Sequence, residues 1–528
     1  MRRAGQPAKK DVRDTTANPP QILITAQEAF PAFERRVLAA RSHIVMGFRL
    51  FDPLTRLRSD AAREVGETWV DLLADALERG VRIDIHHADF DPVAAARLHR
   101  RCWRNVRVLC GLRELVGPKA AERLTVHSDL HPARTGALAR VFFWPFVAAK
   151  MRQLVRQDAE GSKGSVRRRV LKYLPGVAYL RDHMRGRPPL SFPASHHHKL
   201  AVFDDRWLYI GGLDLNDRRW DDRAHDRPAQ DTWHDIQVLL DDPALAVSAR
   251  RHLETFLDTC AGRVAPAETP GLLRTLSQDQ SRRRPWSMAP RTVVPEIALA
   301  HHRAIAGAGR LIYLETQFFR DRRLARALAR RARHVPGLRL ILILPGAPDT
   351  VAFEKTPKLD GRFGDFLQTR CLRILRRAYG PRLLVASPAQ PRRSTGADFD
   401  ADRASLSGAP LVYVHAKLSI FDDALGIVSS ANLNGRSLRW DTEAGVAFDD
   451  PALVARLRRA ALDGWLPDDI DAAGFFDTLD NIYPRLRQLV RTNSKAAPED
   501  RLGFLVPYDR KAAEDTATPL PGMPEEMV

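Results

Sequence analysis

The sequence predicts an α/β protein built from two homologous lobes, and two observations lead to this fold class. Helix-like and strand-like segments alternate with short connections, and the same order occurs in both halves of the chain. A long motif-bearing segment also occurs twice. Alternation of this kind favours sheets covered by helices. We therefore expect two α/β/α sandwich lobes with mixed or parallel sheets.

Apolar residues at helical spacing predict the helices, and short apolar runs rich in β-branched residues predict the strands. In the first half the expected elements are a helix over 26–41, a strand over 43–48, a helix over 68–79 and a strand over 81–86. The order returns as a helix over 294–308, a strand over 311–314, a helix over 321–333 and a strand over 338–344.

The strongest repeat lies further along each half. HHHKLAVFDDRWLYIGGLDLN begins at His196, and VHAKLSIFDDALGIVSSANLN begins at Val414. Identical residues recur at one constant offset, which chance seldom produces. We therefore divide the chain into a disordered tail over 1–20, a first lobe over 21–265 with a basic and aromatic insertion over about 118–190, a linker over 266–290, a second lobe over 291–490 and a flexible tail over 491–528.

Each repeat contains the pattern HxKxxxxD. The predicted catalytic residues are His197, Lys199, Asp204, His415, Lys417 and Asp422. In a strand, residues two apart face the same side, so each His and its Lys project together. A phosphate between them explains the pairing of an imidazole with an ammonium. One neutral His can attack phosphorus and a second, protonated His can protonate the leaving oxygen, while the lysines stabilise charge. The design needs no metal and no other cofactor.

Further residues are expected to bind phosphate or to orient the catalytic groups. Small residues form a turn after each motif, and Asp214 and Asn432 follow these turns. Asp235 and Glu443 each open a later strand. A carboxylate on Nδ1 fixes the tautomer of a histidine, so we expect Asp235 to orient His197 and Glu443 to orient His415. Asp204 and Asp422 stand at strand ends, which favours a role in local structure.

Metal binding by the neighbouring histidines at 196–198 is disfavoured, because adjacent strand residues face opposite sides. The chain has four cysteines and no CxxC pattern, which disfavours a disulfide scaffold or a zinc ribbon.

These motifs resemble those of the phospholipase D superfamily, here as HHKLAVFD at His197 and HAKLSIFD at His415. Softer similarities to the larger, eukaryotic-type enzymes lie in GGLDLNDRRWD, TWHDIQV and IYLETQFF. Asp214 departs from the family's Asn, which leaves open whether it touches phosphate. The resemblance covers most of 21–490. It implies lobes packed side by side, a single active site at their interface and ping-pong chemistry. In that scheme His197 is the nucleophile and His415 the general acid, in a nearly symmetric pair.

The formal net charge of +19 indicates an anionic partner. We expect hydrolysis of phospholipids, or transfer of their phosphatidyl group, through a covalent phosphohistidine. The substrate would lie in an anionic membrane surface, and water or an alcohol would be the acceptor. The aromatic run that begins at Phe142 suits such a surface, and a buried core helix is the alternative. No signal peptide and no spanning segment is predicted, so we expect a monomer in the cytoplasm or peripheral to the inner membrane surface.

Three alternatives stay open. Cardiolipin-synthase-like transfer uses the same site. A nuclease acting on DNA would exploit the positive charge, although the lipid-type motifs make nucleic acid the less favoured partner. A catalytically inactive binding scaffold is the alternative from another class, and the presence of both histidines and both lysines argues against it.

Overall fold

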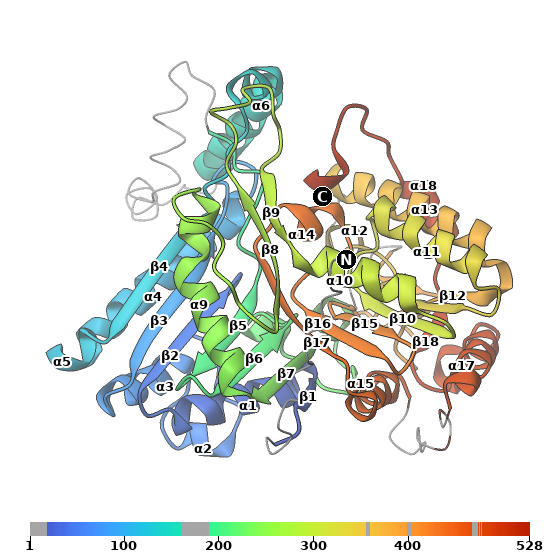
Figure 1. The fold of residues 1–528 in the computed structure, drawn as a ribbon, viewed down its shortest axis with the longest axis horizontal. Helices are drawn as coiled ribbons and strands as arrows, with labels where there is room; N and C mark the ends of the chain where they lie inside the picture. Colours follow the sequence, from blue (N-terminus) through green and yellow to red (C-terminus); the bar gives the residue numbers. More distant parts are fainter. Residues whose placement is uncertain are drawn as a thin grey trace, which may run out of the picture.

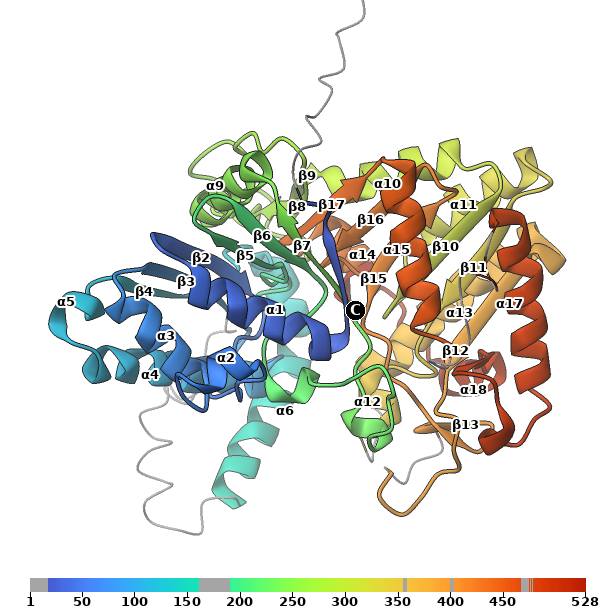
Figure 2. The same cartoon turned by 90° about the horizontal axis from the view of Figure 1, so that it is seen from below.

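The computed structural model describes residues 18–160, 190–354, 359–398, 403–466 and 478–528, together with Gly474 and Phe476. Its main elements form two sheets, each covered by helices (Figure 1). The first lobe, blue to green in Figure 1, lies beside the second, yellow to red. The view from below in Figure 2 shows the same side-by-side arrangement.

The first sheet has seven strands. In spatial order these are β1 (Gln21–Ile24), β7 (Ile236–Asp241), β6 (Trp207–Gly211), β5 (Lys199–Phe203), β2 (His43–Phe48), β3 (Arg82–Asp89) and β4 (Leu124–Leu130). β2, β3 and β4 run parallel, and β5 runs antiparallel to β2. Its faces are covered by α1 (Thr25–Ala39), α2 (Asp60–Arg63), α3 (Trp69–Glu78), α4 (Ala96–Leu115), α5 (Pro118–Ala121) and α9 (Pro243–Cys260).

The second sheet has nine strands. Their order is β18 (Leu505–Pro507), β12 (Leu383–Pro388), β11 (Arg339–Ile343), β10 (Leu311–Thr316), β15 (Lys417–Phe421), β16 (Leu425–Ser429), β17 (Glu443–Phe448), β8 (Leu272–Gln278) and β9 (Arg291–Pro295). The helices around it are α10 (Glu296–Gly307), α11 (Arg322–His334), α12 (Asp349–Ala352), α13 (Leu359–Tyr379), α14 (Gly435–Arg439), α15 (Pro451–Asp463), α17 (Leu479–Asn493) and α18 (Arg510–Thr516). β13 (Ser405–Leu406) and β14 (Ala409–Pro410) form a small separate hairpin.

The predicted fold class is confirmed. The order β7-β6-β5-β2-β3-β4 of the first sheet corresponds to β17-β16-β15-β10-β11-β12 of the second. The pairings also agree, because β10 and β11 are parallel and β15 runs antiparallel to β10. The helices and strands predicted from periodicity all occur, with ends shifted by at most three residues.

Three segments differ from expectation. The expected linker contains β8, whose polar residues Arg274, Thr275 and Ser277 hid the strand pattern although they are buried. The expected C-terminal tail supplies β18, which is too short to show periodicity and pairs with β12. The expected insertion at 118–190 contains β4, a strand of the first sheet whose polar residues are half-buried. Residues 1–17 and 161–189, which hold the predicted N-terminal tail and the basic stretch of that insertion, lie outside the described residues.

The lobes share a core rather than touching through loops. One cluster of buried apolar side chains contains Leu200 and Val202 of β5 together with Leu418 and Ile420 of β15. The face of the first sheet that carries α1 and α3 has its own aromatic core around Phe33. A core common to both lobes fixes the relative position of β5 and β15, the two strands that carry the repeated motifs.

In the ranges that the structure describes, no helix combines the length and apolar character required to cross a membrane.

Candidate active site

The two lobes exchange main-chain hydrogen bonds at the start of each motif strand. The His197 amide donates to the Thr442 carbonyl at 2.8 Å. Symmetrically, the His415 amide donates to the His234 carbonyl at 2.7 Å. Each motif histidine is therefore attached, through its own backbone, to the other lobe.

These main-chain hydrogen bonds determine which carboxylate contacts which imidazole. The residue after Thr442 is Glu443, whose carboxylate lies 3.0 Å from Nδ1 of His197. The residue after His234 is Asp235, and its Oδ2 lies 2.6 Å from Nδ1 of His415. The predicted pairing within each lobe is wrong, because the pairing crosses the interface. In both rings Nδ1 is the engaged nitrogen, which leaves Nε2 to face a substrate.

The small residues after each motif make room for these carboxylates. A side chain at Gly212 would lie 2.2 Å from Asp235 Oδ1. The equivalent residue in the other lobe is Ser430, whose hydroxyl donates to Glu443 Oε2 at 2.5 Å. The turn was expected to let a ligand approach the backbone. Here it lets a catalytic carboxylate approach instead.

Both motif lysines are buried beside their histidines, as the strand geometry predicts. Lys199 Nζ donates to the His197 carbonyl at 2.7 Å and lies 3.8 Å from Asp214 Oδ1. Lys417 Nζ lies 2.7 Å from Nδ1 of His415 and donates to the carbonyl of the same residue. The site thus holds one buried lysine from each motif.

Asp214 and Asn432 occupy equivalent places but have different contacts. Asp214 Oδ1 accepts the Leu50 amide at 3.0 Å, in addition to its ion pair with Lys199. Asn432 donates through Nδ2 to Gln317 Oε1 at 3.2 Å. Asp214 Oδ2 and Asn432 Oδ1 are both buried without a hydrogen-bond partner. The predicted phosphate contact of Asn432 therefore stays a prediction, and Asp214 orients Lys199.

Asp204 and Asp422 lie at the far ends of their strands and do not belong to the catalytic group. Asp204 accepts the amides of Arg41, Ser42 and His43, and its φ of 54° lies in the left-handed region. Asp422 accepts the amides at 309–311 in the same way, with a φ of 55°. The contacts do not support the predicted catalytic role of these two residues, because each carboxylate caps the loop before β2 or β10.

Replacing Asp204 by alanine is expected to lower the free energy of unfolding by about 1–2 kcal/mol, after allowing for solvent screening of this partly exposed carboxylate. Turnover by the folded protein should stay within about twofold. Asp204→Asn keeps an acceptor oxygen and tolerates the left-handed backbone, so it should lose less stability. Denaturant unfolding with parallel activity assays checks this. A stable but inactive Asp204→Ala variant would contradict the structural role.

Burial controls the ionisation of the central groups. Burial, reinforced by the adjacent lysine, holds the pKa of both His197 and His415 well below the ordinary value. It also raises the pKa of Asp235 to about 7 and that of Glu443 to about 8, and it lowers the pKa of Lys417 to about 7. A bound phosphate diester would favour the protonated lysine and histidine. A neutral imidazole suits the predicted nucleophile, His197. Substrate binding would favour the protonated form of the predicted general acid, His415.

Sequence reasoning missed three arginines of the site. Arg49 and Arg436 contribute to the low pKa of His197, and Arg219 contributes to that of His415. The Arg219 guanidinium lies 3.5 Å from the ring centroid of Trp233, which in turn packs 4.6 Å from the ring of His415. Arg219 and Trp233 fall inside the segments GGLDLNDRRWD and TWHDIQV, so their signal was present but unassigned.

Arg49 has an informative counterpart. It follows β2 directly, as Gln317 follows β10, and the two strands pair with β5 and β15 in the same register. One half-site therefore combines an arginine with Asp214, and the other combines an amide with Asn432. This difference makes the two half-sites unequal. The repeated segments do not reveal it, because Arg49 and Gln317 lie far upstream of them.

The neighbouring histidines at 196–198 do not converge on a common ion. His196 Nδ1 lies 2.8 Å from the Thr442 hydroxyl, and His198 Nδ1 lies 3.2 Å from His252 Nε2. His196 and His198, two residues apart, project to the same side and pack on Phe256, whereas His197 faces Glu443.

Comparison with known proteins agrees with this geometry. Residues 302–465 match the family model described as "Cardiolipin synthase, PLD-like domain". The match includes the complete second motif, and the first motif repeats it within the same topology. Residues 302–465 are therefore similar to phospholipase D-like domains. A search of curated protein sequences found no significant match.

Two solved structures are similar to this chain. Phosphatidylserine synthase of Haemophilus influenzae Rd KW20 is 12% identical, with a TM-score of 0.49, over 84% of this chain and 85% of that one. Polyphosphate kinase of Porphyromonas gingivalis is also 12% identical, with a TM-score of 0.40, over 84% of this chain and 49% of that one.

Proposed function

We propose that this phospholipase D-like enzyme transfers the phosphatidyl group of a phospholipid to water or to an alcohol through a covalent phosphohistidine. The observation that carries the proposal is the crossed pair of histidine–carboxylate contacts beside two buried lysines. This arrangement presents two Nε2 atoms and two cations to a single phosphodiester. The lipid substrate is supported by the phospholipid-synthase description of the matching family model.

The steps follow from the contacts. His197 Nε2 attacks phosphorus, so that a P–N bond forms while the bond from phosphorus to the headgroup oxygen breaks. The His415 imidazolium gives its proton to that oxygen, and Asp235 stabilises the imidazolium. Water or an alcohol then enters, loses a proton to His415 and displaces His197 from phosphorus. Lys199 and Lys417 balance the charge of the transferring phosphoryl group in both steps.

A lipid assay tests the proposal. The purified chain is incubated with vesicles of mixed phospholipids and a short primary alcohol, and mass spectrometry identifies the products. Phosphatidate together with a phosphatidyl-alcohol is the expected result, and Asp205→Asn, which lies outside the site, should retain both products. If every lipid stays unchanged while DNA is cleaved, the lipid substrate is wrong and the nuclease alternative holds.

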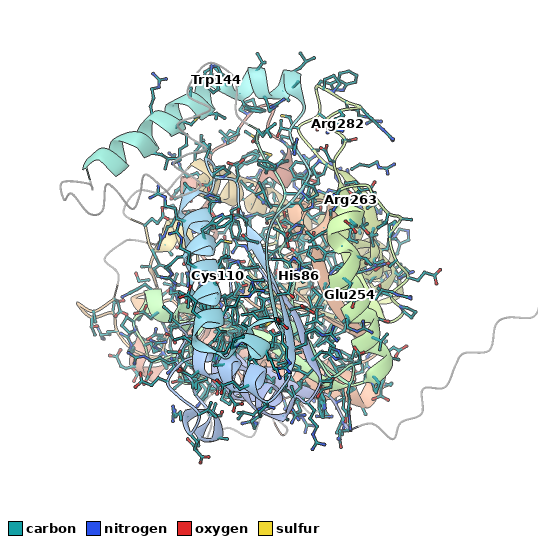
Figure 3. The ribbon with its side chains drawn as sticks, turned by 90° about the vertical axis from the view of Figure 1, so that its left-hand side faces the viewer. His86, Cys110, Trp144, Glu254, Arg263 and Arg282 are labelled. Carbon is teal, nitrogen blue, oxygen red and sulfur yellow. The ribbon has the colours of Figure 1, made fainter. Side chains whose placement is uncertain are left out.

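The structure also offers a surface for lipid. Leu138, Val141 and Phe142 at the start of α6 (Ala137–Glu160) lie beside Trp286 in the β8–β9 loop, because the Leu138 amide donates to the Pro285 carbonyl at 2.8 Å. We call these side chains the apolar cap. Their exposed fractions of 60%, 62%, 78% and 67% place them among the five most exposed large hydrophobic side chains described. Figures 1 and 3 show α6 and the β8–β9 hairpin together at one end of the molecule.

The charge around the apolar cap is predominantly positive. Residues 132–154 and 280–291 contain eight basic residues and no acid: Arg134, Arg140, Lys150, Arg152, Arg282, Arg283, Arg284 and Arg291. Exposed aromatics surrounded by arginine fit the interface of an anionic bilayer. The expected aromatic patch is only partly correct, because Trp144 packs inward against Val93 and Met151 while Phe142 faces outward. The side chain of Phe146 lies outside the described residues.

Replacing Phe142 and Trp286 by serine is expected to weaken binding to anionic vesicles at least tenfold, because each side chain contributes roughly 1 kcal/mol of apolar transfer. Hydrolysis of a water-soluble short-chain substrate should not change. Vesicle sedimentation measures the binding. Leu115→Ser is the matched control, since Leu115 on α4 is 74% exposed but lies away from the apolar cap. An equal loss of vesicle binding in this control, or a changed oligomeric state in the double variant, would contradict a role of the apolar cap in lipid binding.

A further inference from the structure

A second cluster of functional side chains lies on the first sheet, outside the site described above. β3 and β4 are parallel neighbours, and His86 stands directly opposite His127 in their register. Asp129 follows two residues after His127, so it projects from the same face. β4 is the edge strand of the sheet, and its side chains are half-buried. Figure 3 shows His86 between α4 and α9.

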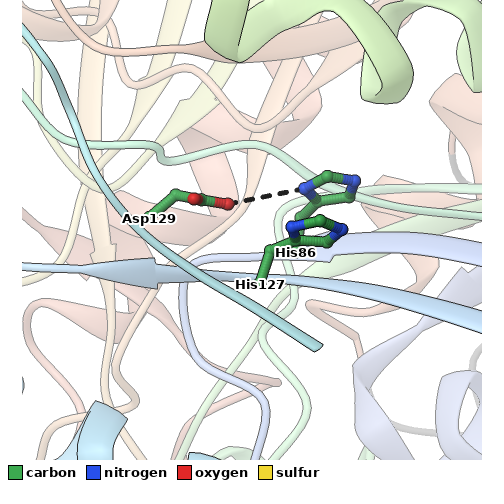
Figure 4. A group of neighbouring side chains, drawn as sticks. All are labelled: His86, His127 and Asp129. Atoms are coloured by element: carbon green, nitrogen blue, oxygen red, sulfur yellow. Dashed lines mark ion pairs between the residues drawn. The ribbon is translucent and has the colours of Figure 1, made fainter. Parts of the chain in front are cut away.

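The three side chains point toward a common space (Figure 4). His86 Nδ1 lies 3.5 Å from Asp129 Oδ2. The two imidazole rings are parallel, with centroids 4.4 Å apart and 6° between their planes. One ligand atom from each of the three residues lies within 4.8 Å of the others. Within the described ranges this is the one group of three such residues that meets this criterion.

The two closest atoms have unmet hydrogen-bonding capacity. His86 Nδ1 and Asp129 Oδ2 are both buried without a hydrogen-bond partner, which is costly for polar atoms. A structural pair on the same strand behaves differently, since Asp89 Oδ1 lies 2.7 Å from His99 Nδ1. The distance from His86 Nδ1 to Asp129 Oδ2 is therefore longer than that of a direct His–Asp hydrogen bond. It suits two atoms that bind the same ion.

We propose that His86, His127 and Asp129 bind a divalent transition-metal ion of the zinc class. Two imidazoles and one carboxylate match the ligands of zinc, whereas calcium and magnesium prefer oxygen alone. Around a tetrahedral zinc with bonds of about 2.0–2.1 Å, ligand atoms stand roughly 3.4 Å apart. His86 and Asp129 already have this spacing. A ring nitrogen of His127 lies within 4.8 Å of both ligand atoms, and a water would complete the coordination.

The surroundings support this chemistry. The His127 ring is stacked on that of His86, and the two residues stand opposite each other on neighbouring strands. An ion there would fasten the edge strand β4 to β3. The chain leaves β4 at Leu130, and the next residue, His131, packs with its ring 4.9 Å from that of His196. The proposed metal site therefore lies near His196, the residue before His197, because His86 and His196 both pack on Phe256. It shares no residue with the catalytic site, and it does not depend on the lipid substrate.

Zinc alone is the probe. The full chain is stripped with a chelator, desalted and titrated with zinc in competition with a chromophoric chelator. One equivalent is expected to bind, and His127→Ala and Asp129→Asn should each weaken it at least tenfold. His334→Ala, which alters an exposed histidine on α11, and His197→Ala, which alters the catalytic centre, should bind zinc as the native chain does.

Cobalt provides a second readout, because its visible absorption is stronger in a four-coordinate site than in water. That absorption should appear in the native chain and vanish in Asp129→Asn, a nearly isosteric change that preserves the sheet even if His127→Ala unfolds. Circular dichroism checks the fold of each variant. Equal zinc affinity in the native chain and in Asp129→Asn, or loss of the ion in His197→Ala instead, would overturn the proposal.

Discussion

Replacing His197 by alanine is expected to reduce turnover of phospholipid by at least about 10⁴-fold, because the reaction loses its nucleophile. Replacing His415 should cost about 10²–10⁴-fold, which is the range for loss of a general acid. Both rings are buried at the lobe interface with Nδ1 held by a carboxylate, so the two variants should fold alike. Any difference between them then reports on chemistry.

An activated substrate separates the two roles. An aryl phosphodiester has a leaving group that departs without protonation, so it should restore much of the first step in His415→Ala. It should restore nothing in His197→Ala. Rapid-quench assays with the aryl and alkyl substrates give both rates. If the aryl substrate rescues His197→Ala instead, the nucleophile and the acid are exchanged.

Replacing Glu443 by glutamine is expected to reduce turnover by about 10³–10⁴-fold, although it removes no atom that touches substrate. The carboxylate accepts Nδ1–H of His197 and keeps Nε2 unprotonated, whereas an amide can donate to Nδ1 and stabilise the wrong tautomer. Ser430 supports Glu443 from the other side, so the carboxylate cannot turn away. Asp235→Asn should act in the same way on His415.

The crossed arrangement makes a specific distinction between these two variants. Glu443→Gln should resemble His197→Ala and show no rescue by the aryl substrate. Asp235→Asn should resemble His415→Ala and be rescued. Each variant is the matched control of the other, because both changes are isosteric and equally buried. The opposite pattern would mean that each carboxylate serves the histidine of its own lobe.

Much of the fold follows from periodicity and repetition. β2, β5, β10 and β15 are apolar strands whose limits were predicted closely, and the repeated motif placed His197 beside Lys199 and His415 beside Lys417. β4 and β8 were not predicted, because both strands carry buried or half-buried polar residues. Those residues are polar for local reasons: Arg274 pairs with Glu296, and His127 faces His86.

The contacts across the interface could not be predicted. Whether Asp235 reaches His197 or His415 depends on main-chain bonds from His415 to His234 and from His197 to Thr442, which join segments far apart in the sequence. Symmetry between the repeats does not help, because both pairings obey it. The equivalence of Arg49 and Gln317 likewise becomes visible only through the registers of β2 and β10.

The number and position of covalent adducts test directly whether both motifs form one active site. The chain is mixed with an aryl phosphodiester, quenched within one turnover and analysed by mass spectrometry of its peptides under conditions that preserve phosphohistidine. We expect at most one phosphoryl group per chain, attached to His197 and absent from His197→Ala. Two adducts per chain, one on each motif histidine, would show two independent sites and contradict it.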